Sequence, residues 1–413
     1  MPIVERITIK DFSQEDRGVT VRETLKLVED SPYFDELQSS FDLESIKDDF
    51  IELPGARTLI NKVLEVENKV QKIDLETELR NVHTAGFTEE NQAVFEIFHV
   101  QNEELIKQFK SDKIELETAY SVKSDYFNEL YQIDKYLNFL LKNQYKNIVD
   151  NNIEMLEEKS KDDSRVKNFR LVVNEEKDII ARAITSTRYK NYNIPFSVFV
   201  TLIQLHLLYK NNDESFYVSK FSLTESEIKV NFENIYDYEF VDKSRLSFSL
   251  VLSNDEIKRE AVKLKGLFAI KFNTDEVFLN QDEGKSDILS FRHGIKVENV
   301  KKELSQLNSS INSFVKDTIT DFEFVKKLEK SSKIDTIREY LVWKVERSRN
   351  EDFRPYKNEI LGLLSNKVSN LFQLLKTLGK IENLFVDEHI QAQDFWRYKI
   401  YQALIEEPKK KKS

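Results

Sequence analysis

The sequence predicts an α+β protein that is predominantly α, in which long helices with heptad-like seams form hairpins or a bundle around a small antiparallel β region. Two observations lead to this prediction. Only eight glycines and six prolines interrupt 413 residues. Apolar residues also recur at steps of three or four in several long segments, as in helices that pack lengthwise. The clearest helix seam has six members: Leu361, Leu364, Val368, Leu371, Leu375 and Leu378.

The N-terminal half is expected to be mostly helical. Residues 1–55 are assigned a short strand at 3–10, where apolar and polar residues alternate, followed by helices. Residues 56–165 are the predicted long-helix region, because the helical spacing starts again after Pro54 and residues 89–158 contain neither glycine nor proline. Residues 166–211 are assigned as a helical connector.

The pattern changes after residue 211. Residues 212–295 are the predicted antiparallel β region, since short runs of β-branched and aromatic residues alternate with turn residues, for example at 216–223 and 246–252. Helical spacing returns over residues 296–407, the predicted C-terminal helical region. Residues 408–413 form a basic tail, which we expect to be flexible.

Composition restricts the classes of function. The chain is 40% hydrophobic and 33% charged, enough to bury a real core and to solvate long helix faces. Its formal net charge of −11 argues against a dedicated nucleic-acid binder, because phosphates repel an acidic surface. The absence of cysteine excludes disulfides, thiolate metal ligands and cysteine nucleophiles.

No membrane association is expected. The most apolar run, residues 194–209, includes Gln204 and His206 and is shorter than the roughly 20 residues that cross a bilayer. The first residues are charged before any apolar stretch develops, unlike a secretory leader. We therefore expect a cytoplasmic protein, or a virion component if the chain is phage-encoded.

One candidate catalytic set is Asp213, Glu227 and Lys229. Nucleases of the restriction type use an acidic residue followed by a Glu-x-Lys strand, whose carboxylates hold magnesium while the lysine steadies the attacking water. The same three-letter pattern recurs at Glu256 and Glu283, however, as chance alone would produce. Solvated strand charges are the favoured alternative.

A second candidate is a nucleic-acid contact in residues 326–357, where basic residues are interleaved with aromatic ones. Its proposed members are Trp343, Lys344, Arg347 and Arg349. The favoured alternative is an amphipathic helix that buries an apolar stripe and turns its charges to water.

Neither a metal nor a cofactor is predicted. None of the five histidines lies three or four residues from another, so no local zinc pair exists. Gly284-Lys285-Ser286 resembles the end of a phosphate-binding loop, but Leu279 occupies the position of the glycine that such a loop needs.

These observations favour a non-enzymatic structural or assembly protein, for instance a component of a phage virion or of a mobile-element complex. Its helices would bind a second copy of the chain or another protein. The alternatives are a nucleic-acid-associated accessory protein of a bacterial defence or chromosome-organising system, and the metal-dependent nuclease described above.

Overall fold

The computed structural model describes the chain from residue 3 to residue 406, with short gaps. The residues not described are 1–2, 10–11, 14–15, 213–214, 236–237, 240–243, 258–260, 273–274, 281–286, 292, 294–301, 303–305, 330–332, 386–389 and 407–413. The predicted basic tail, the Gly284-Lys285-Ser286 segment and Asp213 therefore lie outside the described residues.

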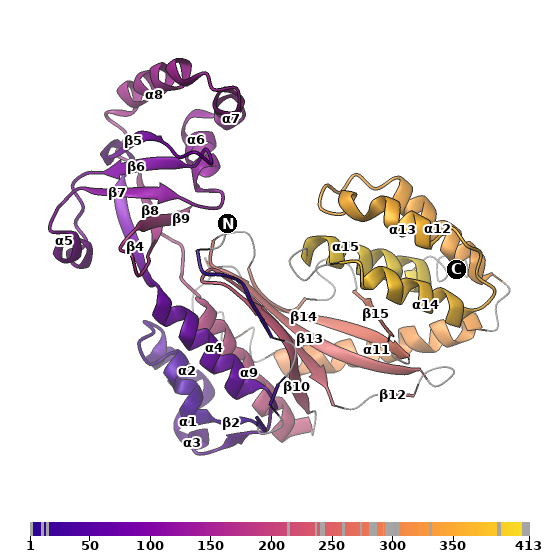
Figure 1. Ribbon diagram of the computed structural model, residues 1–413. Helices are drawn as coiled ribbons and strands as arrows, with labels where there is room; N and C mark the ends of the chain where they lie inside the picture. Colours follow the sequence, from indigo (N-terminus) through magenta and orange to yellow (C-terminus); the bar gives the residue numbers. More distant parts are fainter. Residues whose placement is uncertain are drawn as a thin grey trace.

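Two large β-sheets dominate the fold (Figure 1). One is a six-stranded sheet within residues 71–185, here called the small sheet, and the other is an eight-stranded sheet, here called the large sheet. A third sheet pairs only β2 (Val19–Thr20) with β3 (Phe50–Ile51). Helices cover the small sheet and the large sheet, so the protein is a mixed α and β structure.

Residues 16–70 form a mainly helical cluster beside the two sheets. Its helices are α1 (Val21–Thr24), a 3-10 turn at Leu25–Leu27, α2 (Phe34–Phe41), α3 (Leu43–Ile46) and α4 (Ala56–Lys69). Thr20 and Glu23 form a capping box that fixes the start of α1. β1 (Ile7–Ile9) precedes these helices in the chain and pairs with a strand of the large sheet.

The small sheet has the strand order β4-β8-β9-β7-β6-β5. Its strands are β4 (Gln71–Glu78), β5 (Val82–Phe87), β6 (Ala93–Ile97), β7 (Ile114–Thr118), β8 (Val166–Val173) and β9 (Ile179–Thr185). A 3-10 turn, Leu79–Asn81, links β4 to β5. The helices of this unit are α5 (Glu103–Phe109), α6 (Val122–Tyr131), α7 (Asp134–Lys142) and α8 (Lys146–Ser160).

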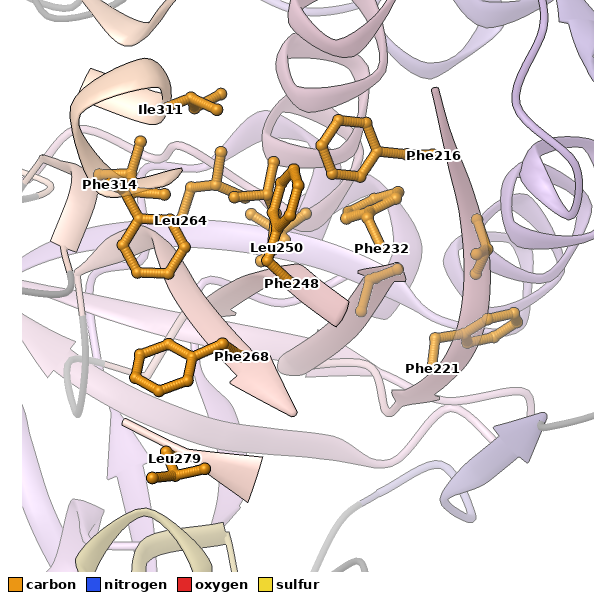
Figure 2. Packing of buried hydrophobic residues seen from close by; sticks show 14 of the residues in the cluster. Phe216, Phe221, Phe232, Phe248, Leu250, Leu264, Phe268, Leu279, Ile311 and Phe314 are labelled. Atoms are coloured by element: carbon orange, nitrogen blue, oxygen red, sulfur yellow. The ribbon is translucent and has the colours of Figure 1, made fainter. Parts of the chain in front are cut away.

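The chain returns through the apolar helix α9 (Ile194–Asn212), which packs against α4, and enters the large sheet. The strands that follow are β10 (Phe216–Leu223), β11 (Glu227–Asn234), β12 (Tyr238–Glu239), β13 (Arg245–Asp255), β14 (Val262–Phe272), β15 (Asp275–Leu279) and β16 (Asp287–Phe291). Every pairing in this sheet is antiparallel, and the sheet is strongly curled. One face carries a phenylalanine-rich core, shown in Figure 2.

C-terminal helices cover the large sheet. They are α11 (Leu307–Glu329), α12 (Ile334–Glu346), α13 (Lys357–Leu363), α14 (Leu371–Glu382) and α15 (Ile390–Tyr401), with a 3-10 turn at Arg354–Tyr356 and a π-type last turn at Gln402–Glu406. Ile311 and Phe314 of α11 join the core in Figure 2, while α14 and α15 lie beside β15.

The predicted fold class is wrong. The protein is not predominantly helical with a small β region, because residues 56–165 contain β4 to β7 and residues 166–211 contain β8 and β9. Along β4, Ile73, Leu75 and Thr77 are buried while the residues between them are exposed, which is the two-residue period of a strand. Steps of three or four residues also join Val70 to Ile73 and Leu75 to Leu79, and that spacing predicts a helix over the same segment.

Coiled-coil seams are also not supported. Between Leu361 and Leu378 the chain leaves the helix after α13 and starts again at α14, where the side chain of Asn370 caps the new helix by accepting a hydrogen bond from Gln373 N at 2.9 Å. Leu361 is only partly buried, while Leu371 is 2% exposed. The apolar spacing spans two short helices that pack inside the chain.

Candidate functional site

The large sheet has a polar face as well as an apolar one. Along β11, Val230 and Phe232 point into the apolar core, so alternation places Lys229, Asn231 and Glu233 on the opposite face. An antiparallel sheet commonly leaves its polar face in water. Here Asn231 and Glu233 are buried, and this face therefore needs polar partners from other elements.

Helix α15 supplies those partners. Asp394 on this helix is surrounded by three cations: the distances from its carboxylate oxygens are 4.0 Å to Lys229 Nζ, 3.6 Å to Lys265 Nζ and 3.9 Å to Arg397 Nη1. Arg397 also donates to Glu382 of α14, with Nε 2.8 Å from the carboxylate. A group of buried charges thus joins the sheet to two helices.

Lys229 is the unusual member of this group. Its Nζ is inaccessible to solvent and has no hydrogen-bond acceptor among the described residues, since Asp394 is too distant for a hydrogen bond. Burial lowers the pKa of Lys229 to about 8. The charges of Arg397 and Lys265 also lower this pKa, whereas the Asp394 carboxylate raises it. The ammonium is therefore held in an environment that does not fully compensate its charge.

A second buried charge cluster joins the small sheet to the large one. Glu256, which follows β13, is fully buried and accepts a hydrogen bond at 2.7 Å from Arg182 Nη1 of β9. Lys72 Nζ of β4 lies 3.1 Å from the same carboxylate, and the Ile194 backbone N–H donates to it at 2.8 Å. Arg170 Nη1 of β8 donates to the Glu256 carbonyl oxygen at 2.6 Å.

The two arginines reach Glu256 because of a local irregularity in the small sheet. Arg170 pairs with Ala183 and the next residue of β8 pairs with Ala181, so Arg182 is an extra residue in β9. Such a β-bulge re-aims a side chain. Burial alone raises the pKa of Glu256, but the charges of Lys72, Arg182 and Arg170 outweigh it and hold the pKa well below its usual range.

The hairpin formed by α7 and α8 has an apolar outer surface, here called the hairpin patch. Its inner face packs into the core of the small sheet. Its outer face carries five of the ten large apolar side chains that are exposed in the described part of the chain: Tyr136, Phe139, Tyr145, Ile148 and Met155. The rings of Phe139 and Tyr145 lie 6.3 Å apart. In Figure 1 the hairpin lies at the outer end of the small-sheet unit, away from the large sheet.

The candidate nuclease residues do not form a visible cluster. Asp213 lies outside the described residues, and Glu227 is paired with Arg6 at 2.9 Å. Lys229 instead faces Asp394. No group of three or more histidine or carboxylate side chains within the described segments is arranged to hold a metal ion.

The basic and aromatic residues of α12 do come together. The Tyr340 and Trp343 rings stack at 6.0 Å, and Lys344 Nζ and the Arg347 guanidinium lie 5.2 and 4.8 Å from the Trp343 ring centre. Trp343 is 42% exposed. Arg349 lies beyond the end of the helix and is exposed. We call Tyr340, Trp343, Lys344 and Arg347 the α12 cluster.

Sequence reasoning missed the Glu256 cluster. A signal for it existed, because Arg170 and Arg182 interrupt otherwise apolar strands, in Phe169-Arg-Leu-Val and Ala181-Arg-Ala. A buried strand rarely carries an arginine without a partner. In the sequence, Glu256 was distinguished only as the first residue of a Glu-x-Lys pattern, which chance also produces.

Comparison with known proteins gives no further assignment. No protein-family model, curated protein or solved structure was found to match this chain. Within the described residues, none of the helices has both the length and the apolar character of a membrane span. The candidate sites therefore stand on their own geometry.

Proposed function

We propose that this protein functions by assembly and that two copies pair through the hairpin patch. The observation that carries this proposal is the concentration of exposed large apolar side chains on α7 and α8. Exposed large apolar side chains that gather on one element mark sites of protein association, whereas single exposed apolar residues are ordinary.

The spacing along α8 suits a symmetric pair. Ile148 and Met155 are one heptad apart, so they lie on the same side of the helix. A two-fold axis near Asn151 and Asn152 places each Ile148 against the Met155 of the second copy, with the two α8 helices antiparallel. Most soluble homo-oligomers use closed symmetry of this type.

Charge complementarity selects a second copy of this chain as the partner. The end of α7 and the start of α8 carry exposed cations, Lys142 and Lys146, while the second half of α8 is acidic on balance, with exposed Glu154 and Glu158 against one exposed lysine, Lys159. Lys142, Lys146 and Glu154 form no ion pair with other described residues. Antiparallel pairing brings the basic end of each hairpin to the acidic end of the other, which favours this register over a parallel one.

Sedimentation velocity or light scattering tests the proposal. At about 50 μM the parent chain is expected to have twice the monomer mass, which would correspond to an affinity in the micromolar range. Met155→Lys and Lys146→Glu are each expected to give monomers. The double variant Lys146→Glu/Glu154→Lys exchanges the charges and is expected to restore the dimer.

Ile319→Ser serves as the matched control, because Ile319 is also an exposed apolar residue but lies on α11. It should retain the parental mass. A parent chain that is monomeric at this concentration, or a dimer that Met155→Lys leaves intact, would show that the hairpin patch does not pair chains.

The α12 cluster supports a second candidate function, contact with single-stranded nucleic acid. An exposed aromatic ring beside two cations is suited to stacking on a base and to pairing with phosphate. The chain has two tryptophans, and the other one, Trp396, is fully buried. Quenching of fluorescence by an oligonucleotide therefore reports on Trp343.

Titration with an oligo-dT at about 50 mM salt is the appropriate measurement, since phosphate contacts are strongest at low salt. If this candidate is correct, Arg347→Gln weakens the quenching and added salt removes it, while Lys326→Gln on α11 has no effect. Absence of quenching at low salt would exclude this candidate.

A further inference from the structure

An open groove lies where the small-sheet unit meets the large sheet, and we call it the junction groove. Its volume is about 650 Å³, which is within the range of binding sites. Most of residues 3–9 line it on one side. The C-terminal part of α4 and the turn between β8 and β9 line the rest.

The strand in this groove, β1, has one unpaired edge in the described part of the chain. β1 is the first strand in the order of the large sheet and pairs with β10 alone. The residues just before it are held from the same side, since the Val4 backbone N–H donates to Glu225 at 3.0 Å and Arg6 Nη1 donates to Ser222 at 3.0 Å. The backbone groups on an unpaired edge can pair with another extended chain.

The junction groove follows this edge. Three successive residues, Glu5, Arg6 and Ile7, all line it. Side chains of neighbouring residues along a strand point to opposite faces, so a space over one face would meet only every second residue. The groove therefore extends along the edge at which β1 has no partner.

The cations that line the described part of the groove already have carboxylate partners. Lys62 and Lys69 both pair with Glu65, at 2.6 and 3.0 Å. Arg6 pairs with Glu227 at 2.9 Å. These contacts satisfy the positive charge of the groove within the protein.

Three carboxylates of the groove have no such partner. Glu5, Glu175 and Glu176 line it and are exposed, and none of them forms an ion pair with another described residue. Ile7 and Ile9 line the same groove and are only partly buried. The groove thus presents accessible apolar surface beside accessible negative charge that nothing in the described chain compensates.

We propose that the junction groove binds an extended, basic segment of a partner protein, which adds as a strand to the free edge of β1. Main-chain hydrogen bonds to β1 hold the segment, and its apolar side chains cover Ile7 and Ile9. Its lysine or arginine side chains meet Glu5 and the two glutamates of the β8–β9 turn, and this charge complementarity selects a basic partner. The site is independent of pairing through the hairpin patch.

Fluorescence anisotropy of a labelled peptide of alternating valine and lysine, mixed with the full chain, tests this assignment. About ten residues suffice to pass residues 3–9 at about 3.3 Å per residue. At about 50 mM salt we expect saturable binding with a dissociation constant below about 100 μM, which added salt weakens. A peptide of alternating valine and glutamate should not bind. A valine–lysine peptide with two central valines replaced by proline should bind many-fold more weakly, because proline has no N–H to donate to β1.

A matched pair of charge-reversal variants places the binding in the groove. Glu175→Lys/Glu176→Lys reverses the charge of the β8–β9 turn and should weaken binding of the valine–lysine peptide several-fold. Glu89→Lys/Glu90→Lys is the control, because these two glutamates are also exposed in a turn of the small sheet, between β5 and β6, but do not line the groove. This control should bind as the parent does.

Hydrogen exchange followed by mass spectrometry reports on the edge of β1 directly. Bound peptide should slow exchange of the backbone amides in residues 3–9, while exchange in α12 stays the same. Absence of saturable binding, equal binding of the valine–glutamate or proline peptide, or unchanged exchange in residues 3–9 would overturn the proposal. A change of oligomeric mass in Glu175→Lys/Glu176→Lys would assign the groove to a second copy of this chain and would overturn it as well.

Discussion

Arg182 and Glu256 form a buried ion pair that ties the small sheet to the large one, with Nη1 and Oε2 2.7 Å apart. Both side chains are essentially inaccessible to solvent. Arg182 reaches this position because it is the extra residue of a bulge in β9. The relation between the sheets therefore depends on electrostatic contacts as well as on apolar packing.

Glu256→Gln is expected to destabilise the protein strongly. The substitution preserves shape but removes the carboxylate that pairs with the buried Arg182, and the loss of one partner from a buried pair costs about 3–5 kcal/mol. Urea unfolding followed by circular dichroism measures the effect. Glu44→Gln, which removes a solvent-exposed pair with Lys47, should leave the midpoint unchanged; equal midpoints for the two variants would contradict the role assigned to Glu256.

The contribution of Glu256 should depend on pH in a defined direction. Its pKa in the folded protein lies below the usual value, so it stabilises the fold above the unfolded-state pKa, about 4.3 for glutamate. The stabilisation declines as the pH falls below that value towards the folded-state pKa. The difference in unfolding free energy between the parent and Glu256→Gln should therefore be constant from pH 7 to about 5 and shrink below about 4; a difference that persists undiminished at pH 3 would contradict the assigned pKa shift.

Leu371→Asp should lower the melting temperature. Leu371 begins α14 and is 2% exposed, so a carboxylate there is buried without a partner, at a cost of several kcal/mol. The favourable interaction of an acidic residue with the helix N-terminus offsets up to about 1 kcal/mol of that cost. We expect a decrease of roughly 5 °C or more.

Lys367→Asp is the control for this experiment, since Lys367 is exposed in the connection before α14. It should melt within a degree or two of the parent. Similar melting temperatures for both variants would mean that Leu371 is not part of the core.

Two glycine substitutions should change stability in opposite directions. A Cβ atom at Gly266 of β14 would overlap the ring of Phe314, which packs over it from α11, and such overpacking costs about 1–3 kcal/mol. A Cβ at Gly362 of α13 has no atom within 4 Å, so alanine should stabilise that helix by about 0.5–1 kcal/mol. Urea midpoints that move in the same direction for Gly266→Ala and Gly362→Ala would contradict the contrast between the close approach of Phe314 to Gly266 and the open space beside Gly362.

The scarcity of glycine misled the prediction of fold class for a physical reason. Strand-rich regions normally place glycine where a turn needs a positive φ. In the described part of this chain eight non-glycine residues adopt positive φ, among them Asn91, Lys110, Gln132 and Gln144, within the region predicted as long helices. The turns were present but did not carry their usual sequence signal.

The spacing of apolar residues predicted the correct element where it fitted only the period of a strand or only the period of a helix. The strand predicted at 216–223 is confirmed as β10, and the helix predicted after Pro54-Gly55 begins at Ala56 as α4. The prediction that long helices continue through residues 56–165 is wrong, because β4 starts at Gln71. Short apolar runs fit both periods, and pairing with β8 decided between them.

The sequence by itself determined the alternation of β10 and β11, the absence of cysteine chemistry and the apolar surfaces that helices such as α4 bury, because these depend on residue type and on neighbours along the chain. Only the tertiary structure decided that Lys229 is buried beside Asp394 and that Glu256 meets two arginines from another sheet. Those contacts join residues distant in sequence, and the burial that shifts their pKa values arises only when helices and sheets pack together.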